Sequence, residues 1–583
     1  MVQLVETLVA SQFQKDIYHW VEFGSGNAII KAVAGSGKTT VLQHSCKIIF
    51  DKFGVQPLAI AFNKHIKDEL SLKIGEFAQI QTFNSLGHRL VGNALGRGHL
   101  NVKDDKYRNI CKKVVIDQNG NNDWETNERL IEELFQLANF CMKTLTGTKS
   151  REDLEEMISN YNLDLESLGI VGGWLGLVIK EGDALARRGI ISFSDQLFLP
   201  YLWKLQPTQK YLWVLGDEMQ DTSSAALELF LKFTDDNTRI LAVADPKQAI
   251  FGFAGANSDA TDRLQSRTNA ISLPLSICYR CPKSHIELAQ KLVPEIQPSP
   301  TASNGEVLEI QMKSSKPKGG YTYEELIPLI RGGELIICRK TAPLISLCIK
   351  LITQRIPAKV RGRDIGASLG KLIDDISKVN KFTFEKFHEY ANILYESRKA
   401  KFIIKQEWGK IESLLDRVQG LLACYEGFDN INDVKSFKKA VIDLFSDTQS
   451  NVVLSTIHKA KGLEADRIVF LHPEICPMRW EGQNREMLQQ EKNLEYVALT
   501  RSKHFLIMAY GLPPKKPSKP PTNKIEDWVK EYEDSKENFF KGCHSPQEVQ
   551  DRYRNLAKQY HPDIPGGNIE LMQELNRQYE LVC

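Results

Sequence analysis

The sequence has little that would place the protein in a membrane or among disulfide-stabilised secreted domains. No run of about eighteen apolar residues could span a bilayer, and the first residues lack a charged leader followed by an apolar core. Eleven cysteines are scattered singly, and the one close pair, Cys278 and Cys281, has no second pair at zinc-finger spacing. We therefore expect a cytoplasmic protein whose thiols are buried and reduced.

The chain also lacks an excess of charge of either sign. Its 75 basic and 73 acidic residues leave a formal charge of +2. A nucleic-acid partner would therefore have to be held by a local basic groove and not by the field of the whole protein. With 583 residues the chain is too long for one hydrophobic core. This length predicts roughly three to five compact units.

The stretch KAVAGSGKTTV follows the apolar residues NAII and precedes a segment with helical apolar spacing. Strand, glycine loop and helix is the order that a phosphate-binding loop requires. Gly35 and Gly37 allow backbone N–H groups to turn inward, Lys38 can reach the terminal phosphates, and Thr39 can ligate magnesium. The loop predicts a site for a nucleoside triphosphate.

A second stretch, YLWVLGDEMQD, is an apolar strand that ends in Asp217 and Glu218. The ends of the strands of a parallel sheet are where such sheets bind ligands. Asp217 could hold magnesium, and Glu218 could orient or deprotonate the attacking water. Together with the phosphate loop, these two acids predict an enzyme that hydrolyses a nucleoside triphosphate.

From Gln14 to about Tyr510 the chain resembles, motif by motif and in order, the superfamily 1 DNA helicases of the UvrD/Rep type. AVAGSGKT resembles that family's phosphate loop, including Ala32, which stands where the strict pattern has glycine. DEMQDTS, LAVADPKQAIFGFAGA, LPLSICYRCP, LSTIHKAKGLEADRIVFL and EKNLEYVALTRSKHFL resemble its later motifs. The catalytic residues implied by the resemblance are Lys38, Glu218, Gln248, Arg280 and Arg501.

The resemblance also implies how ATP and Mg²⁺ are bound. Gln14 would read the adenine, Tyr279 would stack on it, and Glu464 would bind the ribose. Thr39 and Asp217 would hold the metal. The full set of residues implied to bind the nucleotide is Gln14, Ala34, Gly35, Ser36, Gly37, Lys38, Thr39, Thr40, Tyr279 and Glu464. Arg280 would reach the γ-phosphate, and Arg501 would be the arginine finger.

DNA contacts are implied for residues in four stretches: AIAFNKHIKDEL, QTFNSLGHRL and two of the motifs already quoted. They are Phe62, Asn63, Lys64, Thr82, Phe83, Phe253, Thr456 and His458. Each aromatic could instead be an ordinary core residue. The motif context favours DNA stacking for Phe62 and Phe253 and leaves Phe83 open. Ala254 departs from the family, which commonly has arginine there.

For the fold, the resemblance implies an α/β protein with two RecA-like parallel-sheet motor domains, each carrying a helical insertion. The expected first motor domain comprises residues 1–89 and 189–265, with its insertion at 90–188. The expected second motor domain comprises residues 266–365 and 450–510, with a short insertion at 366–449.

The rest of the chain predicts a linker and a small all-α domain. Residues 511–524 are rich in proline and lysine and predict a semi-rigid linker. Residues 525–583 resemble a J domain, the module with which DnaJ-type co-chaperones stimulate DnaK-type chaperones. Its HPD signature, His561, Pro562 and Asp563, lies between two segments of helical spacing and would bind the chaperone. The first helix is weak, so a degenerate J fold that serves only for docking stays open.

The resemblance implies an ATP-dependent DNA helicase that moves 3′ to 5′ on single-stranded DNA. Its partners would be single-stranded and tailed duplex DNA and, through the tail, a DnaK-type chaperone; no membrane partner is expected. Two alternatives stay open. One is an ATP-gated DNA-binding or remodelling ATPase that does not separate strands, and the other is a co-chaperone adaptor addressed to DNA.

Overall fold

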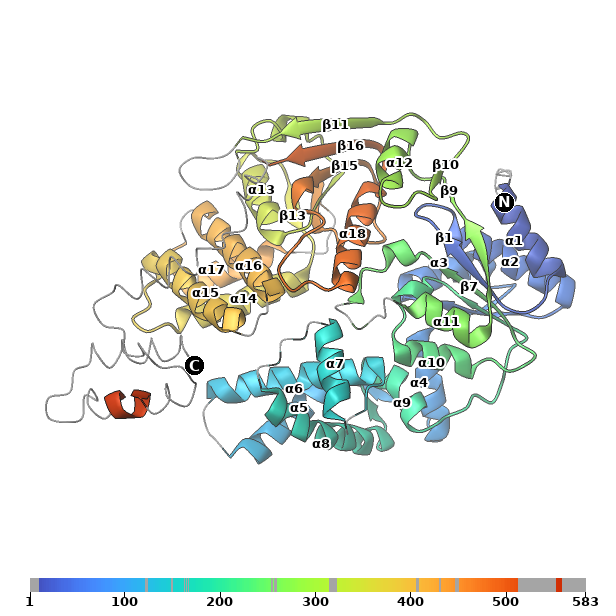
Figure 1. Ribbon diagram of the computed structural model, residues 1–583, viewed down its shortest axis with the longest axis horizontal. Coiled ribbons are helices and arrows are strands. Elements are labelled where there is room, and N and C mark those ends of the chain that lie inside the picture. Colours follow the sequence, from blue (N-terminus) through green and yellow to red (C-terminus); the bar gives the residue numbers. More distant parts are fainter. Residues whose placement is uncertain are drawn as a thin grey trace.

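The computed structural model describes residues 10–120, 124–147, 150–161, 163, 165, 167–252, 255, 259–313, 322–404, 408–428, 431–445, 450–511 and 552–557. Two six-stranded sheets lie in these residues, and every strand pair in both is parallel. Each sheet with its covering helices is called a lobe below, first and second in chain order (Figure 1). The predicted α/β fold with two parallel-sheet motor domains is confirmed.

The first lobe is built on the strand order β3-β2-β6-β7-β1-β8. Its strands are β1 (Ala28–Ala32), β2 (Leu58–Ala61), β3 (Gln79–Thr82), β6 (Trp213–Gly216), β7 (Arg239–Ala244) and β8 (Ile271–Leu275). Side chains of successive β1 residues enter cores on opposite faces, Ile30 against one set of helices and Ile29 against the other. Burial on both faces explains the unbroken apolar runs of β2 and β6, the two strands that are buried throughout.

Helices cover both faces of this sheet. One face is covered by α1 (Gln12–Phe23), α2 (Lys38–Phe53) and α3 (Lys64–Ile74). The other is covered by α4 (Phe83–Ala94), α10 (Ser224–Lys232) and α11 (Ala260–Thr268). The predicted domain boundary at residue 266 is wrong, because β8 pairs with β1 along its whole length, for example Leu273 with Ile30. The first lobe therefore extends to Leu275.

The second lobe has the strand order β11-β16-β15-β12-β14-β13. Its strands are β11 (Glu306–Gln311), β12 (Glu334–Cys338), β13 (Ala358–Val360), β14 (Val452–Thr456), β15 (Ala465–Leu471) and β16 (Ser502–Tyr510). Helix α13 (Thr341–Thr353) packs on one face, and α18 (Arg485–Leu499) packs on the other. A segment with β9 (Ile277–Cys278), α12 (Lys283–Gln290) and β10 (Gln297–Pro298) connects the two sheets.

Both predicted insertions are helical where the structure describes them (Figure 1). The helices of the second insertion share one apolar core with the second sheet and α13. The first contains α5 (Lys106–Asn119), α6 (Trp124–Thr144), α7 (Arg151–Tyr161) and α8 (Leu168–Arg187). The short strands β4 (Asn101–Val102) and β5 (Ile190–Ile191) pair at its base, and α9 (Phe193–Leu202) returns to the first lobe. The second contains α14 (Arg363–Ser377), α15 (Phe387–Ile404), α16 (Trp408–Gly427) and α17 (Val434–Leu444).

The predicted linker and J-like domain lie almost entirely outside the described residues. Of residues 511–583 only Gly511 and the helical stretch 552–557 are described, so His561, Pro562 and Asp563 are not. Across the described part of the chain, no helix combines the length and apolar character needed to cross a membrane.

Candidate nucleotide-binding cleft

The phosphate loop has the backbone that its sequence predicts. Gly35 and Gly37 both have positive φ, +64° and +81°, a conformation that residues with a side chain rarely adopt. Gly37 is the N-cap of α2, which begins at Lys38. The free N–H groups and the positive end of the dipole of this 16-residue helix therefore point into the space in front of β1. The buried hydroxyl of Ser36 has no protein partner among the described residues, which fits a polar ligand at the loop.

Two acids follow β6 beside this loop. Glu218 Oε1 and Oε2 lie 2.9 Å and 3.0 Å from Lys38 Nζ. Glu218 itself has a φ of +49°, which turns its side chain toward the loop at some cost in backbone strain. Asp217 is 2% exposed and accepts a hydrogen bond from the backbone N–H of Glu218 at 2.9 Å. The loop lysine is thus held by an acid that a bound phosphate would have to replace.

Burial and charge push the pKa values of these two carboxyls apart. Burial, reinforced by the negative charge of Glu218, raises the pKa of Asp217 from 3.8 to about 7. For Glu218 burial acts in the same direction, but the charges of Lys38 and Lys461 outweigh it and lower the pKa to about 2. Glu218 is therefore ionised at neutral pH, while Asp217 carries a carboxylate that is costly to keep charged without a cation.

A cavity of about 330 Å³ joins the loop to the second lobe. The catalytic residues implied by the sequence, Lys38, Glu218, Gln248, Arg280 and Arg501, all line it. Gly35, Ser36, Gly37 and Thr39 form the wall on the loop side. Of the predicted metal ligands, Thr39 lines the cavity and Asp217 directly precedes Glu218, so hydroxyl and carboxylate oxygens suited to Mg²⁺ are present beside the phosphate loop.

The predicted arginines reach the cavity from the far side. Arg501, between α18 and β16, is 2% exposed and donates from Nη2 to Gln248 Oε1 at 3.1 Å. Burial, together with the nearby charge of Arg280, lowers its pKa to about 10. Arg280 pairs through Nε with Glu464 Oε2 at 2.6 Å. Glu464, the predicted ribose ligand, also forms an ion pair with Lys503 at 2.6 Å. Arg280 and Glu464 are therefore paired with each other and would have to separate to bind a nucleotide.

The adenine end of the site is formed by α1 and the connecting segment. The amide of Gln14 lies against the phosphate loop, since a Cβ on Gly37 would be 3.7 Å from Gln14 Nε2. Tyr279 is 38% exposed, and its backbone N–H donates to Gly35 O at 2.8 Å. Tyr18, one turn after Gln14, was not predicted. Burial, then the nearby Tyr279, raises the pKa of Tyr18 to about 12, so it also lies at this end.

Sequence reasoning missed the lysine that joins the lobes. Lys461 Nζ lies 2.8 Å and 2.6 Å from the two carboxylate oxygens of Asp221 and donates to Gln248 O at 2.6 Å. Its ammonium also lies 4.8 Å from the centre of the Phe251 ring. Both Lys461 and Asp221 stand inside the quoted motifs, but spacing along the chain gives no sign that they meet.

Helix α18 makes two further contacts that no pattern signalled. The hydroxyl of Tyr496 accepts a hydrogen bond from Ala34 N, in the phosphate loop, at 2.9 Å. Asn493, one turn earlier, donates from Nδ2 to Ala249 O at 2.9 Å and to Pro246 O at 3.3 Å. Together with Arg501, which lies just after the helix, these residues contact two parts of the first-lobe site, the phosphate loop and the turn at residues 246–249. Thr40, also in the predicted set, is exposed in the first turn of α2.

The predicted DNA contacts are not gathered at one place. Phe62, 37% exposed, and Asn63 line the nucleotide cavity, and Asn63 also caps α3 by accepting from Ile66 N at 2.9 Å. Lys64 is exposed. Thr82 caps α4. Phe253 lies outside the described residues.

One of these contacts is wrong, and two others fall on largely enclosed groups. Phe83 is 4% exposed and packs in the core between the first sheet and α4, so it cannot stack on a base. Thr456 is 8% exposed, and its hydroxyl accepts from Lys459 N at 3.4 Å. Burial, helped by the charge of Arg339, lowers the pKa of His458 to about 3, so its imidazole is neutral.

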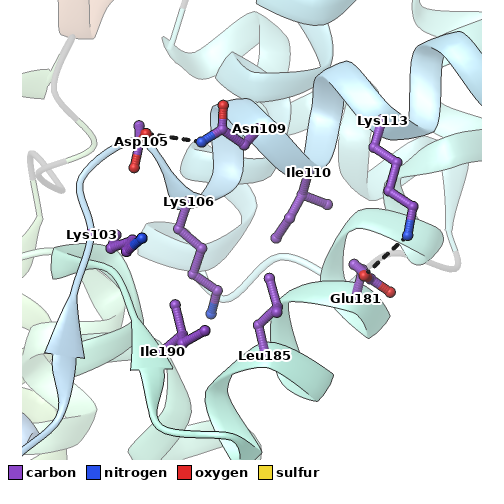
Figure 2. A pocket seen from close by; sticks show the side chains of 9 residues that line it. All are labelled: Lys103, Asp105, Lys106, Asn109, Ile110, Lys113, Glu181, Leu185 and Ile190. Atoms are coloured by element: carbon purple, nitrogen blue, oxygen red, sulfur yellow. Dashed lines mark hydrogen bonds and ion pairs between the residues drawn. The ribbon is translucent and has the colours of Figure 1, made fainter.

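A second cavity, of about 280 Å³, lies in the first insertion, between α5, α8 and the β4–β5 pair. Figure 2 shows Lys106 extending between Ile190 and Leu185. Its Nζ lies 2.6 Å from Asp195 Oδ2 and 2.8 Å from Gly182 O, and this ion pair is almost fully buried. Because the polar groups of this site satisfy one another, we assign it to the stability of the insertion.

Comparison with known proteins agrees with this geometry. Residues 13–269 match the UvrD/REP helicase N-terminal domain family. The chain is 22% identical to the ATP-dependent DNA helicase PcrA of Staphylococcus aureus (strain MRSA252) over 661 residues, which covers 92% of this chain and 88% of the relative. It is also 22% identical to a probable DNA helicase II homolog of Mycoplasma capricolum, with 82% of each chain covered. A Mycoplasma pneumoniae homolog with the same description is similar at 22% identity, with 86% of this chain and 84% of the relative covered. These matches support an ATP-dependent DNA helicase of the UvrD type.

Proposed function

We propose that this protein hydrolyses ATP to move 3′ to 5′ along single-stranded DNA and to separate the strands of a duplex ahead of it. The observation that carries the proposal is the shared cavity. Lys38 and Glu218 line it from the first lobe, Arg501 lines it from the second, and Arg280 reaches it from the connecting segment. A site shared in this way can convert breakage of a phosphate bond into relative motion of the lobes.

Hydrolysis begins with an exchange of partners. The triphosphate replaces Glu218 as the partner of Lys38, and the γ-phosphate replaces Glu464 as the partner of Arg280. Loss of the Lys38 contact raises the pKa of Glu218 from about 2, because that charge is one cause of its low value. The free carboxylate then orients a water molecule and accepts its proton as the water attacks the γ-phosphorus and the bond to the β-phosphate oxygen breaks.

The other residues stabilise charge and exclude water. Thr39 and Asp217 would hold Mg²⁺, which when bound neutralises phosphate charge. Arg501 is already desolvated at 2% exposure, so its charge acts in a poorly screened environment. An arginine finger is worth on the order of a thousandfold or more in the rate of phosphoryl transfer.

Contacts between the lobes transmit the change to DNA. Gln248 accepts from Arg501 and lies next to the loop that Asn493 holds by its backbone. Lys461 binds Asp221 and the same loop. Loss of the γ-phosphate therefore changes the partners of groups on both lobes at once, which favours opening of the cleft. Base stacking on the aromatics of that loop would be tolerant of sequence.

The test is ATP turnover with and without single-stranded DNA, alongside displacement of duplexes that carry either a 3′ or a 5′ tail. We expect DNA to stimulate turnover and only the 3′-tailed duplex to be displaced. The Lys38→Ala protein should do neither, and Glu218→Gln should bind ATP without hydrolysing it. Turnover by Lys38→Ala at the parental rate would refute the assigned site.

A second candidate is an ATP-gated protein that clamps or remodels DNA without separating strands. The second insertion favours it, because only residues 363–444 are available there for helices that could contact a duplex. DNA-stimulated turnover without displacement of either tailed duplex would support this candidate over the helicase.

For the tail we propose recruitment of a DnaK-type chaperone through His561, Pro562 and Asp563, which the sequence supports. His561→Gln should abolish stimulation of a DnaK-type ATPase and leave DNA-dependent turnover unchanged. If both activities fell together, the tail and the motor would not be separate modules. Deletion of residues 525–583 tests the adaptor alternative, which unaltered function in cells would eliminate.

A further inference from the structure

Cys278 and Cys281 lie on either side of two residues of the nucleotide site. Cys278 is the last residue of β9, and Tyr279 and Arg280 stand between it and Cys281. The two cysteines are 0% and 2% exposed. Their backbone is therefore the same short turn that positions the predicted adenine-stacking ring and the arginine of the cavity.

This turn packs directly against the phosphate loop. A Cβ on Gly35 would lie 2.9 Å from Cys278 Sγ and 2.6 Å from Arg280 Cβ, which is too close for any side chain there. The backbone N–H of Tyr279 donates to Gly35 O at 2.8 Å. Cys278 and Cys281 also share one apolar cluster with Ala34 and Tyr496, which join the two lobes. A change in the shape of the turn would therefore displace the phosphate loop at Gly35.

The two cysteines lie next to each other in the turn. Cys281 N donates to Cys278 Sγ at 3.4 Å, and Cys281 Sγ donates to Thr500 O at 3.5 Å. The nearby side chain of Cys281 is the main reason that the pKa of Cys278 falls to about 7. The nearby Cys278 side chain and burial raise the pKa of Cys281 well above its usual range. Cys278 is the better nucleophile of the pair, and Cys281 remains a thiol.

The other cysteines in the described ranges differ from this pair. Burial raises the pKa of each of their thiols, as at Cys46, Cys338 and Cys424. These buried, protonated thiols are poor nucleophiles. The reactive chemistry of this set is thus concentrated at the nucleotide site.

We propose that Cys278 and Cys281 form an oxidation site in which a peroxide creates a reversible disulfide that switches off ATP turnover. The inference rests on the proposed function, because it assigns a regulation to the same nucleotide site. A small oxidant suits two sulfurs that lie in the wall behind the cavity and become accessible when the lobes separate at Ala34 and Tyr496.

The chemistry is complete with one molecule of hydrogen peroxide. The Cys278 thiolate attacks one peroxide oxygen, the O–O bond breaks, and Cys278 sulfenic acid and hydroxide result. The Cys281 sulfur then attacks the sulfenic sulfur, and the S–O bond breaks. The hydroxide released in each step leaves as water after taking up a thiol proton. The two thiols are oxidised by two electrons, and the peroxide is reduced to two molecules of water.

Formation of the bond must distort the turn. The sulfurs have to approach to about 2.05 Å, and Cys281 Sγ has to leave its hydrogen bond to Thr500 O. Only Tyr279 and Arg280 separate the cysteines, so their backbone absorbs the movement. A displacement of about 1 Å in a positioned catalytic group can cost about a hundredfold in rate. We expect oxidation to lower DNA-stimulated ATP turnover at least tenfold, roughly, for the same reason.

The experiment uses the full chain, reduced and then freed of reductant. Samples are treated with hydrogen peroxide, quenched with catalase, and divided. One part is alkylated, digested and examined by mass spectrometry for a peptide with a disulfide between Cys278 and Cys281. The second part is assayed for ATP turnover with single-stranded DNA, before and after dithiothreitol. The third is titrated with a fluorescent ATP analogue.

Cys278→Ser and Cys278→Ala are the matched controls, and each is compared with its own untreated sample. The parental protein should form the disulfide, lose turnover and recover it with dithiothreitol, while both variants should change by less than about twofold. Absence of this disulfide, or an equal loss in the variants, would overturn the inference. If the reduced protein showed no DNA-stimulated turnover, the proposed function would be contradicted. The titration with the ATP analogue would then test the inference: weaker binding after oxidation would support it, and unchanged binding would overturn it.

Discussion

Replacement of Asp217 by asparagine is expected to make the protein more stable while it removes ATP hydrolysis. Asp217 is 2% exposed, and its pKa is raised from 3.8 to about 7 by burial and by the charge of Glu218. At about 1.4 kcal/mol per pKa unit, the ionised carboxylate costs on the order of 4 kcal/mol of folding free energy above pH 7. Asparagine removes this charge and keeps an oxygen that can accept the hydrogen bond from Glu218 N.

Part of that gain is lost, because Lys38 is attracted to Asp217 and loses this attraction in the variant. We expect a net gain of about 2 kcal/mol in the free energy of unfolding, or roughly 4–8 °C in melting temperature for a lobe of this size. The gain also depends on pH. Because the pKa is raised, the folded protein keeps the proton on Asp217 up to a higher pH than the unfolded chain does. The loss of stability from the ionised carboxylate therefore begins above pH 4 and is complete only above pH 7.

The assay is thermal unfolding of parent and variant at pH 5 and pH 8, without nucleotide and with a chelator to remove divalent cations. The difference in melting temperature should at least halve at pH 5. Glu218→Gln is the matched contrast. Its lowered pKa means that the ionised form stabilises the fold at any pH well above 4.5, so this variant should melt below the parent at both pH values. A variant Asp217→Asn that melts at or below the parent at pH 8 would refute the reasoning.

Three further changes test other parts of the structure. Arg501→Ala should lower the turnover number on the order of a thousandfold and leave ATP-analogue binding within a few fold; unchanged turnover would contradict its role. Tyr496→Phe leaves the buried N–H of Ala34 without its acceptor, so we expect a loss of about 1–3 kcal/mol, shared between the free energy of unfolding and the free energy of ATP binding. An unchanged melting temperature together with an unchanged ATP affinity would contradict the contact. Phe83→Ala should cost about 3–5 kcal/mol of stability without changing single-stranded DNA affinity in fluorescence anisotropy, whereas weaker binding by a fully folded variant would restore the stacking interpretation.

The resemblance to known helicases implied the two-sheet fold, whereas the residues themselves indicated only two strands, both in the first sheet. Residues 28–30 and 213–215 are apolar without alternation, which is typical of strands covered on both faces. The boundary at residue 266 failed at a strand whose apolar pattern is weak. Strand β8, ISLPL, contains Pro274 and exposed positions, which a sheet tolerates only at an edge, and β8 is indeed the edge strand beside β1.

For the site, the sequence indicated the residue types but not the contacts that cross between lobes. Lys38 and Glu218 stand in stretches whose composition shows their chemistry. The bond between Ala34 and Tyr496 joins residues 462 positions apart, and no spacing rule reaches across such a distance. Phe83 shows the opposite difficulty. An aromatic at the start of a helix can face solvent or the sheet, and only the packed fold decides which.

The position of β16 in its sheet has a consequence for synthesis on the ribosome. This strand lies between β11 and β15, although almost two hundred residues separate β11 from it along the chain. Strand β11 therefore waits for its neighbour until residues 502–510 have left the exit tunnel, while the first lobe, complete at Leu275, is free to fold much earlier. At roughly 5–20 residues per second, β11 stays unpaired for about 10–40 s. A ribosome that stalls in this interval leaves an exposed strand edge next to a finished ATP-binding lobe, a form that cellular quality control has to recognise.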